Sequence, residues 1–247
     1  MQVVGYDQSV PALLVSDDDG LDRVELTTGQ ELSYSLGDRH CAGTIHEGQH
    51  LACGATKAPH CQDHSHVWVC ARCTGECLKD EMDCYDTHAV YLAAFAPDVF
   101  KVGVTRAERL ETRLREQGAD RGAHIRTASN GRIAREIEAG LAAEIPDRVR
   151  VPTKREGLHR SVDEGAWNQL LEEFDVIDRY QFSHGLDLAD QPMDEVLAAG
   201  TVQGTQGRLL VLDKNKSSYA IDMRELVGFE LQSGSHSRNL QSSLGSF

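Results

Sequence analysis

The chain has 247 residues, of which 40% are hydrophobic and 6% aromatic, and its formal net charge is −14. Its mean hydropathy of −0.40 is typical of a globular protein and excludes the fibrous and membrane classes. No run approaches the roughly 18 apolar residues that a membrane-spanning helix needs. The N-terminal sequence MQVVGYDQSV has neither the basic start nor the apolar centre of a signal peptide, so we expect a cytoplasmic protein without membrane contact.

Charge is unevenly distributed along the chain. There are 25 basic and 39 acidic residues, and only 6 of the basic ones are lysine. An acidic, lysine-poor composition is expected of a protein that works at high salt, which predicts a halophilic source. Residues 101–160 differ from the rest, because they hold 14 basic and 9 acidic residues. This stretch could bind nucleic acid, although ordinary ion pairs on solvated helix faces would give the same composition.

The first half of the chain contains three kinds of segment. Residues 1–40 alternate short apolar runs with turn-forming residues, which predicts two or three strands. Residues 41–87 are rich in Cys, His and Gly without hydrophobic periodicity, so ligands rather than a core are expected to hold them together. The runs AVYLAAF and VFKVGVT then flank a break at 96–98 and predict a β-hairpin.

The hairpin loop fixes which side chains share a face. With 96–98 as the loop, Tyr91 lies opposite Gly103 and Ala93 lies opposite Lys101. Tyr91, Phe95, Lys101 and Gly103 then share one face, which a half-buried hairpin would leave in solvent. The opposite face is expected to form the core; its residues are Val90, Leu92, Ala94, Phe100, Val102 and Val104.

Helical periodicity follows the hairpin. Residues 106–117 predict a helix that ends at Gly118. Residues 132–145 predict a second helix, which ends before Pro146. Its core-facing stripe is expected to hold Ile133, Ile137, Leu141 and Ile145.

The last part of the chain is predicted to contain two more helices and a set of strands. Ser161 and Glu164 form a capping-box pattern before a third helix, which would bury Trp167, Leu170, Leu171 and Phe174. Residues 190–200 predict a shorter helix. The runs RLLVLD, SYAIDM and LVGFEL within 201–232 predict strands, and residues 233–247 are expected to be disordered.

All the cysteines lie within one short segment. They are Cys41, Cys53, Cys61, Cys70, Cys73, Cys77 and Cys84. Disulfides are disfavoured in a protein without a secretion signal, whereas thiolates on tight loops suit the tetrahedral, sulfur-rich coordination of structural zinc. An iron–sulfur cluster and reactive, redox-sensing thiols are the alternatives.

The spacing suggests how the ligands divide. Cys70 and Cys73 form a chelating pair, which Cys77 and Cys84 could complete as one zinc site. A second site would combine Cys41, Cys53 and Cys61 with one histidine, chosen among His60, His64 and His66. Because spacing does not fix pairing, an interleaved arrangement in which Cys53 and Cys61 join the chelating pair is equally consistent.

The order of residues after the cysteines resembles the GIY-YIG nuclease superfamily. Ala89-Val90-Tyr91 stands where GIY would, and Lys101-Val102-Gly103 stands where YIG would, with lysine in place of the second tyrosine. The chain also resembles a family of unknown function in which a cysteine-rich segment precedes VYLA, KVGVT and R…QGA, and a glycine-spaced segment such as GTVQGTQGRLLV follows. The nuclease-like part covers residues 88–150.

The resemblance implies a role for each of four residues. Tyr91, with help from Lys101, would orient or deprotonate the attacking water. Arg113 would bind the phosphoryl oxygens, and Glu138 would hold Mg²⁺ or Mn²⁺. Such a set would meet the needs of phosphodiester hydrolysis, namely an activated water and a cation that stabilises the developing charge.

The sequence therefore predicts an α+β protein with a GIY-YIG-like core, a zinc-binding segment and a small β lobe. Its expected units are N-terminal strands at 1–40, a cysteine-rich segment at 41–87, a GIY-YIG-like domain at 88–180, a C-terminal helix with strands at 181–232, and a tail at 233–247. The predicted activity is cleavage or binding of DNA or RNA; a non-catalytic zinc adaptor or scaffold is the alternative. The residues expected to grip nucleic acid are Lys101, Arg113, Arg115, Arg121, Arg126, Arg132 and Arg135.

Overall fold

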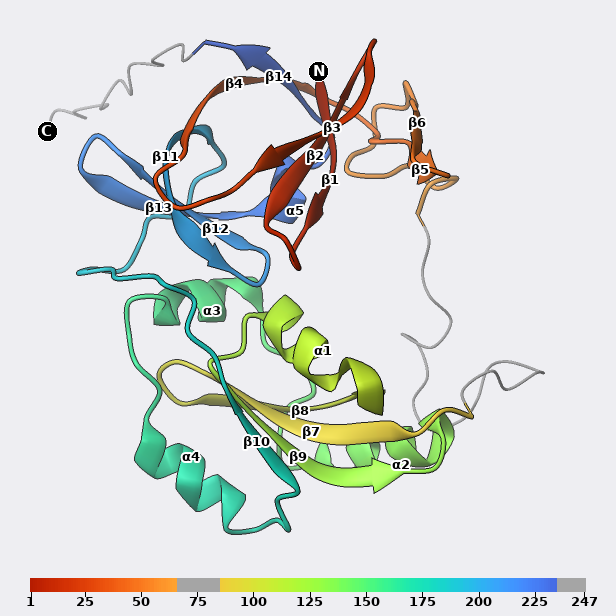
Figure 1. Cartoon of the computed structure of the whole chain (residues 1–247), viewed down its shortest axis with the longest axis vertical. Helices are drawn as coiled ribbons and strands as arrows, with labels where there is room; N and C mark the ends of the chain where they lie inside the picture. Colours follow the sequence, from red (N-terminus) through yellow and green to blue (C-terminus); the bar gives the residue numbers. More distant parts are fainter. Residues whose placement is uncertain (66–84, 235–247) are drawn as a thin grey trace, which may run out of the picture.

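The computed structural model describes residues 1–65 and 85–234. These residues form an upper lobe around an eight-stranded sheet and a lower lobe around a four-stranded sheet (Figure 1). A small two-stranded sheet, β5 (Thr44–His46) with β6 (Gln49–Leu51), lies beside the upper lobe. The combination of antiparallel sheets with separate helices confirms the predicted α+β class.

The upper lobe joins the two ends of the chain. Its strands run in the order β13-β12-β11-β4-β14-β1-β2-β3, and all neighbours are antiparallel. The N-terminal strands are β1 (Gln2–Asp7), β2 (Ala12–Asp17), β3 (Gly20–Glu25) and β4 (Glu31–Arg39). The C-terminal strands are β11 (Ala198–Gln206), β12 (Leu209–Lys214), β13 (Ser217–Asp222) and β14 (Phe229–Ser233). Residues 1–40 thus form four strands instead of the predicted two or three.

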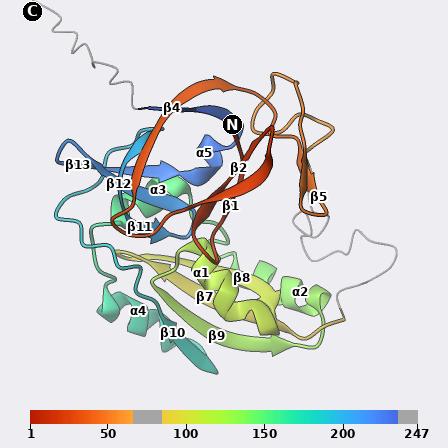
Figure 2. The same ribbon diagram turned by 45° about the horizontal axis from the view of Figure 1, so that its top comes forward.

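The core of the upper lobe contains side chains from both ends of the chain. Val3 and Leu13 are fully buried in it together with Leu210 and Leu212. The strands curve, and the short helix α5 (Met223–Leu226) lies within the lobe (Figure 2). Burial of these apolar side chains is the main stabilising contribution, at about 1.5 to 3 kcal/mol for each large one.

The lower lobe is built on the predicted hairpin. Strands β7 (His88–Phe95) and β8 (Val99–Arg106) pair with Tyr91 opposite Gly103 and Ala93 opposite Lys101, which confirms the predicted register. On its other edge β7 pairs with β9 (Arg121–Ala128), which in turn pairs with β10 (Asp178–Gln181). The sequence did not predict β9 or β10.

Both faces of β7 are buried, so the prediction of a solvent-exposed face is wrong. Val90, Leu92, Ala94 and Val102 lie in one core cluster, as expected. Tyr91, only 1% exposed, lies in a second cluster on the opposite face with Leu114 of helix α1. The continuous apolar run of β7 is the pattern typical of a strand covered on both sides.

Helix α1 (Leu110–Gln117) follows β8 after a short 3₁₀ turn, η2 (Ala107–Arg109). It ends at Gly118, whose left-handed backbone (φ 69°) places its N–H on the last carbonyls of the helix. A residue without a Cβ is favoured there. The predicted end of this helix is confirmed.

Helix α2 (Gly131–Leu141) is shorter than the predicted 132–145. The Asn130 side chain caps it by accepting a hydrogen bond from the N–H of Ile133 at 2.9 Å. Ile133 itself is 41% exposed and does not belong to the core-facing stripe, because Ala134 takes that position. Ile137, Leu141 and Ile145 pack on the sheet as expected.

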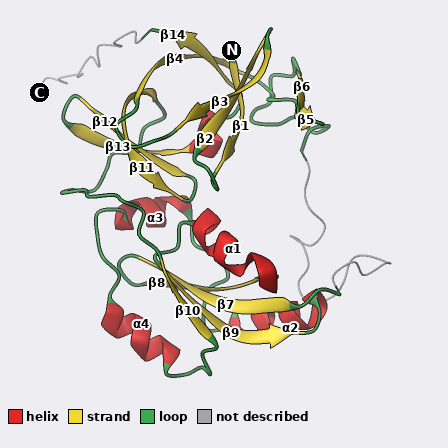
Figure 3. Ribbon diagram, in the orientation of Figure 1, coloured by secondary structure: helices red, strands yellow, loops and turns green. Residues whose placement is uncertain are grey.

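Helices α3 and α4 complete the lower lobe, where most of the helical structure lies (Figure 3). Helix α3 (Val151–Gly157) was not predicted. Helix α4 (Glu164–Leu171) is present and buries Trp167, but Asp163 rather than Ser161 caps it, through a hydrogen bond from the N–H of Ala166 at 3.0 Å. The capping-box prediction is therefore wrong, and Glu164 instead pairs with Arg121.

The helix predicted at 190–200 does not form. Met193 instead pairs with Tyr219 at the outer edge of β13, and its N–H donates to the carbonyl of Ser218 at 2.8 Å. The last three residues of the predicted helix open strand β11. Pairing with a strand distant in sequence has overridden the local helical pattern.

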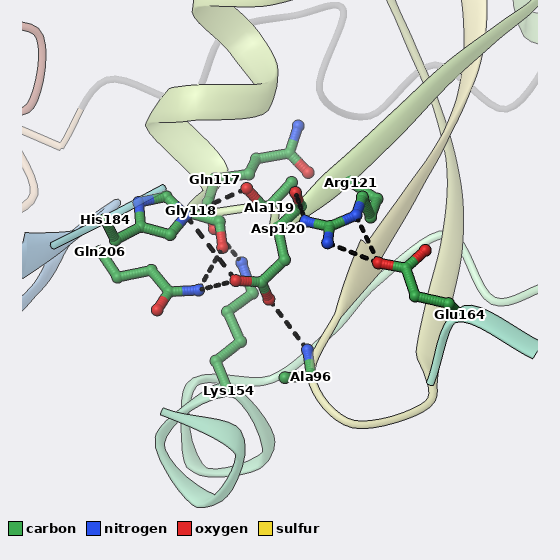
Figure 4. Close-up of polar contacts among 10 residues, drawn as sticks. All are labelled: Ala96, Gln117, Gly118, Ala119, Asp120, Arg121, Lys154, Glu164, His184 and Gln206. Carbon is green, nitrogen blue, oxygen red and sulfur yellow. Dashed lines mark hydrogen bonds and ion pairs between the residues drawn. The ribbon is translucent and has the colours of Figure 1, made fainter. Parts of the chain in front are cut away.

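The two lobes meet where the turn between β11 and β12 packs on the end of α1. A Cβ on Gly207 (φ +58°) would lie 2.7 Å from the backbone nitrogen of Gly118. Beside it, the Gln206 side chain donates to the Gly118 carbonyl at 2.9 Å and to the Asp120 carboxylate at 3.2 Å (Figure 4). Only glycine permits this backbone conformation together with such a close approach.

Asp120 extends this junction into the hairpin. Its carboxylate accepts a hydrogen bond from the N–H of Ala96 at 2.9 Å and lies 3.9 Å from His184 Nε2. Burial raises the pKa of Asp120 and lowers that of His184. The junction is thus partly desolvated, and each polar group in it depends on its neighbours for hydrogen bonds.

We predict that Gly207→Ala destabilises the protein by more than Gly185→Ala. Both positions have positive φ, which costs an L-residue about 1–2 kcal/mol. A Cβ added at position 185 (φ +67°) would meet open space within 4 Å, whereas a Cβ added at position 207 would meet the backbone of α1. Urea unfolding should therefore show the larger loss for Gly207→Ala, and equal losses would contradict the close packing of the lobes.

Candidate functional site

The first candidate site is a cluster of three cysteines and a histidine. Cys41 lies two residues after the end of β4, and Cys53, Cys61 and His64 come from the loop after β6. One ligand atom from each of these residues lies within 4.8 Å of all the others. In the described part of the chain, this is the one group of three or more metal-binding side chains. The cluster can hold a metal ion such as zinc.

The distances within the cluster suit a tetrahedral ion. His64 Nδ1 lies 3.4 Å from Cys41 Sγ and 3.3 Å from Cys61 Sγ. Tetrahedral zinc, with bonds of about 2.3 Å to sulfur and 2.0–2.1 Å to nitrogen, would hold these atoms about 3.6 Å apart. Small shifts would complete the coordination shell.

Backbone hydrogen bonds position Cys41 and favour its thiolate. Its N–H donates to the Ala55 carbonyl at 2.8 Å, and its Sγ accepts from the N–H groups of Gly43 at 3.4 Å and Cys61 at 3.2 Å. Burial acts to raise the pKa of the Cys41 thiol, but these hydrogen bonds outweigh it and lower the pKa. A thiolate is the form that binds a metal ion.

The cluster supports one of the predicted ligand divisions. One of the predicted sites combined Cys41, Cys53 and Cys61 with a histidine. In the structure, the histidine that lies with these three cysteines is His64. The Cys61-x2-His64 spacing could have singled it out, because two ligands three residues apart commonly chelate one ion. The remaining predicted ligands, Cys70, Cys73, Cys77 and Cys84, lie outside the described residues, as does His66.

The second candidate site surrounds the Tyr91 hydroxyl. Tyr91 lies on β7, Lys101 on β8, Arg113 on α1 and Glu138 on α2. The Tyr91 hydroxyl accepts a hydrogen bond from the Gln117 amide at 2.5 Å and also contacts Arg113. A Cβ at position 103 would lie 2.5 Å from this hydroxyl, so Gly103 leaves the space that Tyr91 occupies.

The charges of Arg113 and Glu138 act on both Tyr91 and Lys101. Burial raises the pKa of the Tyr91 phenol, and the hydrogen bonds from Gln117 and Arg113 oppose this. Burial lowers the pKa of Lys101 to about 8, against the opposing effect of Glu138. The fold thus brings the four predicted residues into one electrostatic environment, from four separate elements.

Glu138 and Arg113 already have partners within their helices. Glu138 Oε2 lies 2.6 Å from Arg135, and its side chain is 12% exposed. Arg113 lies 3.3 Å from Glu116, with about half of its side chain exposed. A ligand at this site would have to compete with, or share, these ion pairs.

Most of the basic residues predicted to grip nucleic acid form similar ion pairs. These pairs are Arg113–Glu116, Arg115–Glu111, Arg121–Glu164, Arg132–Glu136 and Arg135–Glu138. Lys101 and Arg126 have no ion pair in the described part of the chain. Although segment 101–160 has more basic than acidic residues, most of the positive charges proposed to bind nucleic acid are therefore already paired with carboxylates.

Comparison with known proteins identifies a family but no activity. Residues 29–196 match the family described as protein of unknown function (DUF2797). The chain belongs to the DUF2797 family. The matched region of this DUF2797 protein includes the Cys41 cluster and all four residues of the Tyr91 site. No curated protein and no solved structure matches the chain.

The described part of this DUF2797 protein contains no helix with the length and apolar character needed to cross a bilayer.

Gln117 is a site residue that sequence reasoning missed. Its side-chain amide donates a hydrogen bond to the Tyr91 hydroxyl, and its backbone carbonyl accepts a hydrogen bond from Lys154 Nζ at 2.6 Å. Gln117 lies one helical turn after Arg113, so the two side chains share a face of α1. That spacing could have identified it once Arg113 had been chosen.

We predict that His64→Ala removes one equivalent of bound metal and lowers the unfolding temperature. The reason is that loss of the fourth ligand opens the coordination shell of a structural site, whose metal binding contributes to folding. His46→Ala is the matched control, because its side chain is 74% exposed and lies outside the cluster. Metal content measured by mass spectrometry should fall only in the first variant; unchanged content would rule out this ligand set.

Proposed function

We propose that this protein is a GIY-YIG-type phosphodiesterase that binds and cleaves nucleic acid with the help of Mg²⁺ or Mn²⁺. The observation that carries the proposal is the convergence of Tyr91, Lys101, Arg113 and Glu138. They come from two strands and two helices, yet Arg113 and Glu138 act electrostatically on both of the other two. The order of hairpin, arginine helix and glutamate helix is the order that the nuclease resemblance requires.

The residue types match the steps of phosphodiester hydrolysis. Arg113 is half exposed beside the Tyr91 hydroxyl, so its guanidinium could bind two phosphoryl oxygens at once. Glu138 supplies one carboxylate, and Mg²⁺ is commonly held by one or two carboxylates with water completing its shell. When bound, the metal would stabilise the charge that develops on the phosphoryl group.

The shifted pKa values of Tyr91 and Lys101 indicate different roles for these two residues in proton transfer. The Tyr91 phenol is protonated at neutral pH, and burial raises its pKa further, so it is suited to donate a hydrogen bond to the attacking water or to a phosphoryl oxygen. Lys101, with a pKa of about 8, is closer to the pH at which a side chain can both accept and release a proton. We therefore assign proton acceptance to Lys101 and positioning to Tyr91.

A structural role for zinc completes the proposal. The cluster of Cys41, Cys53, Cys61 and His64 supplies four ligands and leaves no open position for substrate. We propose that it binds zinc and holds the loops after β4 and β6 in place. Chemistry is then confined to the Tyr91 site.

A non-catalytic adaptor or scaffold is the second candidate, and one observation favours it. Five of the seven arginine and lysine side chains proposed to grip nucleic acid already pair with carboxylates. Together with the net charge of −14, this weakens attraction to a polyanion. Protein partners would not be affected in the same way.

The deciding experiment compares Glu138→Gln with Glu136→Gln in cleavage of labelled DNA and RNA. Both residues lie on α2 and each pairs with an arginine, but Glu136 is half exposed and pairs with Arg132. With Mg²⁺ or Mn²⁺ present, we expect Glu138→Gln to lose at least a hundredfold in rate and Glu136→Gln to keep the wild-type rate.

Salt concentration and a second variant make the result interpretable. Assays at low and high salt separate weak binding from absent chemistry, because binding to phosphates weakens as salt rises. Tyr91→Phe removes only the hydroxyl and should also slow cleavage. If the wild-type protein cleaves neither polymer and is not retained by either at low salt, the adaptor role replaces the proposal.

A further inference from the structure

A cleft of about 660 Å³ lies between the two lobes. It is bounded by α1, α3 and the β11–β12 turn, and Tyr6 of β1 also contributes to its wall. Its volume falls in the range of small-molecule sites. The basic residues that line it are Arg113, Arg150, Lys154, Arg155 and Arg208, and the acidic ones are Glu116, Asp194, Asp222 and Glu225.

Lys154 differs from three of the other four cations that line the cleft. Arg113, Arg155 and Arg208 each pair with a carboxylate, namely Glu116, Asp194 and Asp222. Lys154 has no carboxylate partner in the described part of the chain. Its Nζ donates a hydrogen bond to the backbone carbonyl of Gln117 at 2.6 Å and lies 4.2 Å from the centre of the Phe95 ring. An ammonium group has three N–H donors, so two remain for a ligand.

The charges that act most strongly on Lys154 are mostly of the same sign. Lys101, Arg208 and Arg113 repel its ammonium, and Asp120 attracts it less strongly. Burial is the largest effect, and together these lower the pKa of Lys154 to about 7. A half-buried cation without a counter-charge costs stability, and such costs are typical of binding sites. An anion in the cleft would offset both the desolvation and the repulsion.

We propose that the inter-lobe cleft binds the phosphate group of a phosphate monoester, with Lys154 as the main contact and Arg208 and Arg150 as supporting ones. Arg208 is about one-third exposed on the β11–β12 turn, and Arg150 is exposed at the start of α3. A dianionic phosphate suits this set, because it can accept from several cationic donors at once. Two sources share the chemistry of a dianionic phosphate monoester: a free nucleotide and the 5′-terminal phosphate of a nucleic acid strand.

The proposal does not depend on hydrolysis at the Tyr91 site. Arg113 lines the cleft and also contacts the Tyr91 hydroxyl, so the two sites are adjacent, but the cleft contains its own cations. Glu138 does not line it. Glu138→Gln is therefore expected to lose cleavage and to keep phosphate binding, and the two proposals can fail separately.

Lys154→Met is the variant of choice because it should fold. It keeps the apolar stem and removes the ammonium that burial disfavours, so the variant is expected to be at least as stable as the wild type below pH 7. The pKa of Lys154 is depressed from 10.5 to about 7 in the folded state, so the wild-type protein loses stability as the pH falls through the interval between these two values. Urea unfolding at pH 6 and pH 9 checks this: the advantage of the variant should be larger at pH 6.

The binding test uses the full-length protein and three probes: inorganic phosphate, AMP and a 5′-phosphorylated oligothymidylate. Lys216→Met is the matched control, because Lys216 is exposed in the β12–β13 turn and does not line the cleft. We expect calorimetry to show about tenfold weaker binding in Lys154→Met, as loss of a charge-assisted hydrogen bond predicts, and unchanged binding in Lys216→Met.

The probes also identify the source of the phosphate. Similar affinities for AMP and the oligonucleotide would indicate a free nucleotide, and at least tenfold tighter binding of the oligonucleotide would indicate a strand; either result supports the phosphate site. The proposal is overturned if none of the probes binds, or if Lys154→Met binds them as tightly as the wild-type protein does.

Discussion

The close approach of Gly207 to Gly118 is the constraint on which the Tyr91 site and the inter-lobe cleft depend. A backbone-to-backbone contact of this kind holds the β11–β12 turn on the end of α1, and Gln206 and Asp120 add hydrogen bonds beside it. Helix α1 carries Arg113 and Gln117, and the turn carries Arg208. Fixing these two elements therefore fixes the wall of the inter-lobe cleft and the groups around the Tyr91 hydroxyl together.

Local structure was predictable where neighbours in sequence decide it. The hairpin register follows from its loop, and Gly118 ends α1 because of its backbone freedom. The elements that were missed depend on distant partners. Strand β9 has no alternating pattern, because four consecutive residues in it are buried, and the segment around Met193 has a helical pattern but pairs with β13. The burial of Tyr91 likewise results from α1, which covers the face that a lone hairpin would expose.

In the candidate sites too, some features were predictable from the local sequence and others depend on the packing of distant segments. Cysteine spacing predicted a metal-binding segment, and the fold supplied His64 as the partner of Cys41, Cys53 and Cys61. The resemblance selected Tyr91, Lys101, Arg113 and Glu138, but their mutual influence depends on packing between α1, α2 and the hairpin. Lys154 carried no signal in the sequence. Its significance comes from the absence of a carboxylate that forms an ion pair with it, which only the three-dimensional arrangement of the described residues reveals.

The upper lobe has a consequence for biosynthesis. Gln2 of β1 pairs with Glu230 of β14, so this sheet closes only after β14 has left the ribosome. Strands β1–β3 can form a meander early, but the edge of β1 that later meets β14 stays open during translation. The lower lobe, whose strands and helices lie between 88 and 181, can fold first. An exposed strand edge during synthesis can pair with other chains, so the upper lobe is the half of the protein with the greater risk of aggregation before its sheet closes.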